Sequence, residues 1–196
     1  MKTILLSLSV LLSLAVAAQE DNYTDSIQSY RIAYISTHEV VKDADRAKLN
    51  FFPISKTYYL ATRFEQVTEA PWFKMETSGK TKRLYRVYGI LHFTIAGKSL
   101  KLHIYQSKDL MNTEKYADHL FIPFTDETCG EESYENGRYI DLSIPELNSN
   151  FSLDFNKAYN PYCAYKSNTF ECPIPPAENH LAVKIKAGEM KYAGGH

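Results

Sequence analysis

Residues 84–106, LYRVYGILHFTIAGKSLKLHIYQ, contain the pattern that decides the fold. Apolar and polar side chains alternate through 91–95 and again through 99–104, so every second side chain points to the same face of a strand. Ala96-Gly97-Lys98 separates the two runs, and a glycine in such a short connection is typical of a tight hairpin. The stretch therefore predicts two antiparallel strands with one buried face.

Shorter runs of the same kind lie on both sides of this hairpin. We expect strands at 58–64, 72–77, 119–124, 138–144, 151–155 and 181–187. Residues 24–39 predict a helix, because Ile27, Tyr30 and Tyr34 fall on one helical face. This order predicts a mainly β fold, a single antiparallel β-sandwich or partly closed barrel with an N-terminal helix and a loop-rich C-terminal region. Its β body spans about 57–190.

The first eighteen residues have the three parts of a signal peptide. Lys2 is basic, residues 4–16 are mostly apolar, and Val16-Ala17-Ala18 supplies the small residues that precede a cleavage site. A transmembrane anchor is the alternative, but the apolar run is shorter than the ~20 residues of a spanning helix. We therefore expect residues 1–18 to be removed, 19–196 to form one β-rich domain, and the product to be periplasmic or secreted without a membrane span.

Composition excludes some partners. The formal net charge is −1 and the chain has no basic cluster, which argues against nucleic-acid binding. The chain contains fifteen tyrosines and one tryptophan. Tyrosine is typical of strands and of wet aromatic surfaces, because its ring packs while its hydroxyl finds a polar partner. The oligomeric state does not follow from these features.

Three C-terminal blocks resemble a known family. They are PFTDETCGEESYENGRYIDL (123–142), DFNKAYNPYCAY (154–165) and CPIPPAENHL with IKAGE (172–181 and 185–189). Together with ETSGKTKRLYRVYGILHFTIAG (76–97) they are similar to an uncharacterised bacterial family, catalogued as domain of unknown function 1684. Cys129 departs from the family pattern, which usually has Ser or Thr there. The resemblance implies a single mostly β domain and brings no established activity.

The cysteines predict one disulfide. Cys163 and Cys172 are nine residues apart in a loop bounded by Pro161 and Pro173, and exported proteins commonly oxidise such pairs. Two free structural thiols, or a metal or catalytic role, are the alternatives; zinc would need two further ligands at close spacing. We expect Cys129 to be a free, partly buried thiol.

Three aspartates near strand ends are candidate catalytic groups: Asp126, Asp141 and Asp154. A pair of carboxylates could act as acid and base in a periplasmic hydrolase. The commoner role is structural, with a carboxylate that accepts backbone N–H groups or pairs with Arg138.

The remaining polar residues of the C-terminal blocks predict a ligand cleft at one end of the sheet, lined by Arg138, Asp154, Asn156, Tyr159, Asn160 and Asn179. Such a set suits a small polar or anionic ligand and a non-catalytic domain. The alternative is a segment whose amides cap its own turns and which serves as a scaffold. No cofactor motif or metal-ligand spacing occurs, although His92 and His103 are expected to face each other across the hairpin.

Overall fold

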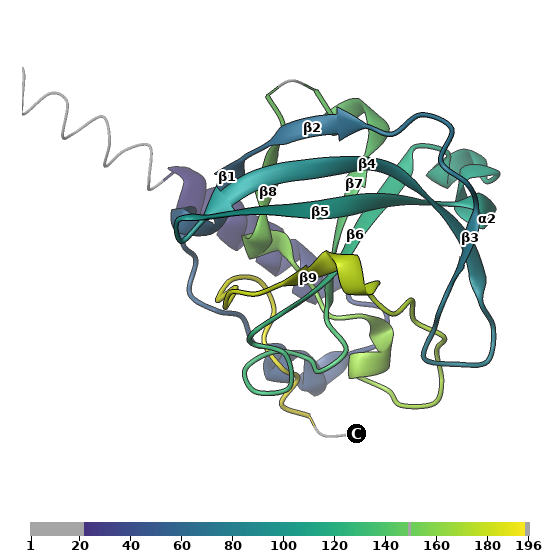
Figure 1. Ribbon diagram of the computed structural model, residues 1–196. Coiled ribbons are helices and arrows are strands. Elements are labelled where there is room, and N and C mark those ends of the chain that lie inside the picture. The colour runs from purple at the N-terminus through teal and green to yellow at the C-terminus, as the bar shows by residue number, and fades with distance from the viewer. Residues whose placement is uncertain (1–21, 149, 195–196) are drawn as a thin grey trace, which may run out of the picture.

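The computed structural model describes residues 22–148 and 150–194 (Figure 1). Its strands are β1 (Tyr59–Ala61), β2 (Arg63–Gln66), β3 (Phe73–Met75), β4 (Arg83–Ile95), β5 (Lys98–Ser107), β6 (His119–Asp126), β7 (Arg138–Ser143), β8 (Ser152–Asp154) and β9 (His180–Leu181). An N-terminal α-helix spans 22–37, and α2 (Lys108–Met111) follows β5. Short 3-10 helices are η1 (Asp43–Lys48), η2 (Lys56–Tyr58), η3 (Glu114–Tyr116), η4 (Ile144–Glu146), η5 (Phe155–Lys157), η6 (Tyr162–Ala164) and η7 (Ala177–Asn179).

The long β4–β5 hairpin is the centre of the sheet, as predicted. In the described part of the chain the main sheet has seven strands, with the path β2-β4-β5-β6-β7, β3 beside β4 and β9 beside β6. All pairs are antiparallel except β6 with β9. At the hairpin turn Ala96 and Gly97 have φ values of 50° and 73°, the left-handed conformation that a two-residue turn requires. The mainly β fold is confirmed, and the sheet stays open instead of closing into a barrel.

The two faces of the sheet carry different side chains. One face is largely aliphatic and packs Leu91, Leu102 and Ile122 against β8 and the C-terminal segment. The other face is aromatic and brings Tyr85, Tyr105, Phe121 and Tyr139 together. In β5, β6 and β7 this division follows from period two, because neighbouring residues of one strand point to opposite faces. In β4 the register shift between Val87 and Gly89 moves Tyr85 to the face opposite Leu91.

Two predicted strands differ from the structure. The run 58–64 is interrupted at Thr62, whose N–H and hydroxyl both donate to the Phe151 carbonyl, at 3.3 and 2.7 Å. The interruption sends β1 to β8 and β2 to β4. Only Leu181 of the predicted strand 181–187 lies in a strand, because the carbonyls of Ile185 and Ala187 accept hydrogen bonds from a buried side chain instead of a neighbouring strand.

The N-terminal helix covers one end of the sheet. It spans 22–37 instead of the predicted 24–39, and it buries Ile27 while Tyr30 and Tyr34 are half-buried on the same side. Tyr30 OH donates to the Lys157 carbonyl at 3.2 Å, so the helix lies against the segment that follows β8. The predicted signal peptide lies outside the described residues. No helix within the described ranges is long and apolar enough to cross a membrane.

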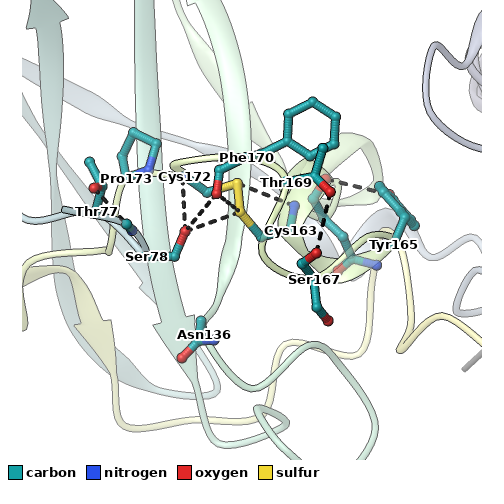
Figure 2. Close-up of a disulfide and its surroundings, with 12 residues drawn as sticks. Thr77, Ser78, Asn136, Cys163, Tyr165, Ser167, Thr169, Phe170, Cys172 and Pro173 are labelled. Atoms are coloured by element: carbon teal, nitrogen blue, oxygen red, sulfur yellow. Dashed lines mark hydrogen bonds between the residues drawn. A yellow bond between two sulfur atoms is a disulfide. The ribbon is translucent and has the colours of Figure 1, made fainter. Parts of the chain in front are cut away.

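The predicted disulfide between Cys163 and Cys172 is present, with a Cα–Cα distance of 6.2 Å, and Cys129 is a free thiol. Figure 2 shows Ser78, from the connection between β3 and β4, beside the bridge. Ser78 Oγ lies 3.1 Å from Cys163 Sγ and accepts the Cys172 N–H at 3.0 Å. The disulfide loop is therefore fastened to the main sheet as well as closed on itself.

Candidate functional site

Arg138 lies entirely inside the protein, with 0% of its side chain exposed. Its Nη2 donates to Asp126 Oδ2 at 2.5 Å, and Asp126 is equally inaccessible. Its terminal nitrogens also donate to the carbonyls of Ile185, Ala187 and Glu189. The expected pairing of Arg138 with a carboxylate is confirmed. The expectation that Arg138 is partly accessible in a cleft is wrong, because its donors are directed at the C-terminal segment.

Asp154 and Asn156 join the end of β8 to the segment before the sheet. Asn156 Nδ2 donates to the Ser55 carbonyl at 2.8 Å, and Asn156 Oδ1 accepts the Ser55 N–H at 3.0 Å. Asp154 accepts a hydrogen bond from Tyr23 OH at 3.1 Å. Asp154 and Asn156 are both buried. They hold chain segments together, as the structural alternative predicted for this block.

Asn179 has a similar role between β5 and β6. Its side chain is fully buried, accepts the His103 N–H at 2.8 Å and donates to the carbonyls of His103 and Pro123 at 2.9 and 2.7 Å. His103 lies opposite Ile90, and His92 lies opposite Lys101. The expectation that the two histidines face each other is therefore wrong, because the strand register places them on a diagonal.

Glu189 forms a buried carboxylate site that the sequence did not single out. Its oxygens accept the Asn160 N–H at 2.8 Å and the hydroxyl of Tyr165 at 2.7 and 2.8 Å. Tyr34 of the N-terminal helix donates to Glu189 at 3.1 Å. Burial raises the pKa of Glu189 to about 7, although these hydrogen bonds favour the charged form. The predicted site residue Asn160 thus belongs to a network that fixes the helix to the C-terminal segment.

The predicted site residues therefore do not form one cleft. Arg138 and Asn160 both bond to Glu189, whereas Asn156 and Asn179 each lie in another buried network. Asp126 and Asp154 are hydrogen-bonded within these networks. Tyr159 and Asp141 are the two predicted residues that reach an open cavity.

That cavity, which we call the tyrosine cleft, has a volume of about 660 Å³. It lies between the N-terminal helix, the aromatic face of the sheet and the disulfide loop. Its lining includes tyrosines from all three: Tyr30, Tyr34, Tyr85, Tyr139, Tyr159 and Tyr162. The polar and charged residues of the lining are Thr37, His38, Glu39, Arg83, Ser107, Asp109, Asp141 and Glu171. At the disulfide the wall is formed by Phe170, Cys172 and Pro173.

Asp141 is the carboxylate at the centre of the site's hydrogen bonds. Tyr159 OH donates to Asp141 Oδ2 at 2.8 Å, and His119 Nε2 lies 3.3 Å from Asp141 Oδ1. The Asp141 side chain keeps 50% of its surface exposed. Burial and the charge of Asp141 together raise the pKa of Tyr159 well above its usual value, so the phenol keeps its proton and donates it to the carboxylate.

A second, more open cavity of about 830 Å³ lies beside the hairpin turn, over Thr94, Lys101 and His180. No group of three or more metal-ligating side chains comes together in the described residues. The tyrosine cleft is the stronger candidate site, because aromatic walls and a few directed polar groups are typical of small-molecule sites.

The comparisons with known proteins agree with this fold. A family described as protein of unknown function (DUF1684) matches residues 45–190. The chain belongs to this family. An uncharacterized protein of Haloarcula marismortui, solved by solution NMR, is 30% identical to this DUF1684 member, with a TM-score of 0.65, and the match covers 88% of this chain and 96% of that one. No curated protein matches. The Haloarcula relative means that family membership does not place the host among the bacteria.

The buried ion pair predicts a large stability effect. Arg138→Ala leaves the Asp126 carboxylate buried without its partner, so the free energy of unfolding should fall by ~3–5 kcal/mol. In a domain of this size each kcal/mol of lost stability lowers the melting temperature by roughly 2–4 °C, so the loss should be readily measured. Arg63→Ala, at an exposed pair with Glu65, is the control and should change little. An Arg138→Ala protein that melts like the wild type would contradict the structural role.

Glu189 predicts a pH dependence of stability. Its pKa is about 7 in the folded protein, against ~4.3 in an unfolded chain. Between these values the folded state binds more protons, so the free energy of unfolding falls as pH rises, by at most ~1.4 kcal/mol per pH unit, and levels off above the folded pKa. Glu189→Gln should remove this component. Chemical denaturation from pH 5 to 8 gives the free energy of unfolding of the wild type and of the variant. A difference between the two that does not change with pH would refute the raised pKa of Glu189.

Proposed function

We propose that this protein binds a small polar ligand in the tyrosine cleft and is not an enzyme. The observation that carries the proposal is the cleft itself, a cavity of about 660 Å³ with tyrosine side chains from three separate parts of the chain and one half-exposed aspartate, Asp141. Aromatic rings supply contact area at low entropic cost, and a few polar groups orient the ligand.

The burial of the other candidate residues favours binding over hydrolysis. An acid–base pair needs two carboxylates that reach one substrate. Asp126 is committed to Arg138, and Asp154 is committed to Tyr23 and Asn156. Asp141 remains as the sole member of the original trio in the cleft. The hydrolase alternative, which needed a pair of these three aspartates, is therefore the weaker candidate; Glu39, Asp109 and Glu171, the other carboxylates of the lining, were not part of it. An anionic ligand loses its expected partner because Arg138 is unavailable.

We propose further that the chain is exported and that residues 1–18 are its signal peptide. The disulfide supports an oxidising compartment, because such bonds persist outside the reducing cytosol. In this proposal the mature domain works in the periplasm or outside the cell, and the bridge holds one wall of the cleft in place.

A ligand screen by thermal shift tests the binding proposal. A compound present at about 100 times its Kd should stabilise the protein by ~2.7 kcal/mol, a rise of roughly 2–4 °C per kcal/mol. Thr37→Trp fills the cleft from the exposed end of the N-terminal helix and should abolish this rise. Ser36→Trp adds the same bulk at the neighbouring exposed position outside the cleft lining and should leave it intact.

The two variants also separate the alternatives. A ligand that stabilises both tryptophan variants equally binds elsewhere and refutes the cleft as its site. A screen without any ligand favours the scaffold role. Hydrolysis of a chromogenic ester or glycoside by the wild type, and its loss in Asp141→Asn, would favour the hydrolase instead.

Mass spectrometry of periplasmic material tests export. The expected product begins at Gln19, and non-reducing peptide mapping should show one Cys163–Cys172 bridge and one alkylatable thiol, Cys129. A membrane-bound product that retains Met1, or three alkylatable thiols in freshly prepared protein, would overturn the proposal.

A further inference from the structure

The hydroxyl hydrogens of five of the six cleft tyrosines are already committed to the protein's own acceptors, Tyr85 being the exception. Tyr159 donates to Asp141 and Tyr162 donates to Glu39, both at 2.8 Å. Three more cleft tyrosines donate to Lys157 O, Glu189 and Pro173 O; they are Tyr30, Tyr34 and Tyr139. These side chains can therefore offer a ligand only ring faces and oxygen lone pairs, which attract positive groups and N–H donors.

Thr37 and Ser107 are the other hydroxyl residues of the lining, and Ser107 Oγ accepts the Leu110 N–H at 3.4 Å. Thr37 Oγ1 donates to the Ala33 carbonyl at 2.8 Å. His38 Nδ1 accepts the Val41 N–H at 2.9 Å, and burial lowers the pKa of His38, so the ring is neutral and carries its hydrogen on Nε2, a buried donor without a hydrogen-bond partner among the described residues. A ligand rich in negative oxygens finds few other donors beside this N–H and the guanidinium of Arg83.

The fixed charges of the lining are predominantly negative. Four carboxylates line the cleft among the described residues, Glu39, Asp109, Asp141 and Glu171, against the guanidinium of Arg83. Arg83 Nη1 lies 4.0 Å from Asp109, so its charge is partly matched within the lining.

Other charged groups around the cleft leave this balance in place. His119, on the far side of Asp141, adds a positive charge when it is protonated. Burial raises the pKa of Tyr30 to about 12, with a smaller contribution from the charge of Asp141. The chain already places one of its own cations on this surface, since Lys157 Nζ lies 5.7 Å from the centre of the Tyr30 ring.

We propose that the ligand of the tyrosine cleft is an organic cation with an ammonium group. The inference rests on the proposed function of the cleft and adds the class of ligand. Ring faces attract an ammonium group through their quadrupole, and carboxylates strengthen the attraction where water is partly excluded. The cleft is large enough for a small amine with its hydrocarbon part, and the walls from Tyr162 and Phe170, whose ring centres are 5.2 Å apart, supply apolar contact.

The test is a titration of the protein with matched probes, followed by NMR chemical shifts of the cleft amides. The probes are choline, the neutral alcohol in which a tert-butyl group replaces its trimethylammonium group, a neutral monosaccharide and acetate. Choline should bind about tenfold more tightly than its neutral isostere, because the two differ in charge and hardly in shape. A higher salt concentration should weaken the binding of choline and leave the affinity of the isostere unchanged.

Two pairs of variants locate the effect. Asp141→Asn removes the central charge, so it should lower the affinity for choline about five- to tenfold and have little effect on the affinity for the isostere. Glu135→Gln is its control, because Glu135 is exposed and makes none of the ion pairs found in the described ranges. Tyr162→Leu removes a ring and should weaken choline, whereas Tyr162→Phe keeps the ring face and should not.

The outcomes separate this inference from the proposed function. Equal affinity for choline and its isostere, or monosaccharide binding that shifts the cleft amides without any response to the cations, overturns the cationic ligand and leaves the binding cleft intact. Acetate binding with similar shifts also overturns it. If none of these probes shifts the cleft amides while a compound from the thermal screen does, the cationic class is refuted; if no compound of any class does, the proposed function fails as well.

Discussion

A single guanidinium organises the C-terminal half of this protein. A buried charge is tolerated where it is paired and hydrogen-bonded, and the two terminal nitrogens of Arg138 donate to one carboxylate and three main-chain carbonyls, while its Nε has no partner among the described residues. Those carbonyls belong to a segment that would otherwise pair with a strand. The same segment then places Glu189 under the N-terminal helix, and the helix supplies two tyrosines of the cleft. The site therefore depends on an interaction that no ligand touches.

The sequence predicted the β body well where the alternation of apolar and polar residues served only to form a strand. Alternation through 84–106 predicted the hairpin, since period two and a left-handed turn leave few other structures. Alternation through 181–187 failed as a strand prediction because the same spacing serves another purpose there. Leu181, Ile185 and Ala187 bury their side chains in the aliphatic core, while the carbonyls of Ile185 and Ala187 accept hydrogen bonds from Arg138.

The site was only partly predictable for a related reason. The C-terminal blocks predicted Tyr159 and Asp141 as site residues, but sequence does not distinguish a buried, satisfied arginine or asparagine from an exposed one. Tyr30, Tyr34 and Tyr162 were visible as an excess of tyrosine, and their convergence depends on contacts between the helix, β7 and the disulfide loop. Composition indicated a wet aromatic surface, and the long-range contacts decided where it lies.

The position of the carbonyls that accept from Arg138 also bears on the order of events during synthesis. They lie 47 to 51 residues after Arg138, whereas the hairpin that they help to cover is complete by residue 107. A nascent chain that stops short of these residues therefore carries the Arg138 cation without its main-chain acceptors. The interior around Arg138 can close stably only once residues 185–189 have been synthesised, so the order of synthesis sets the earliest point at which this part of the fold can form.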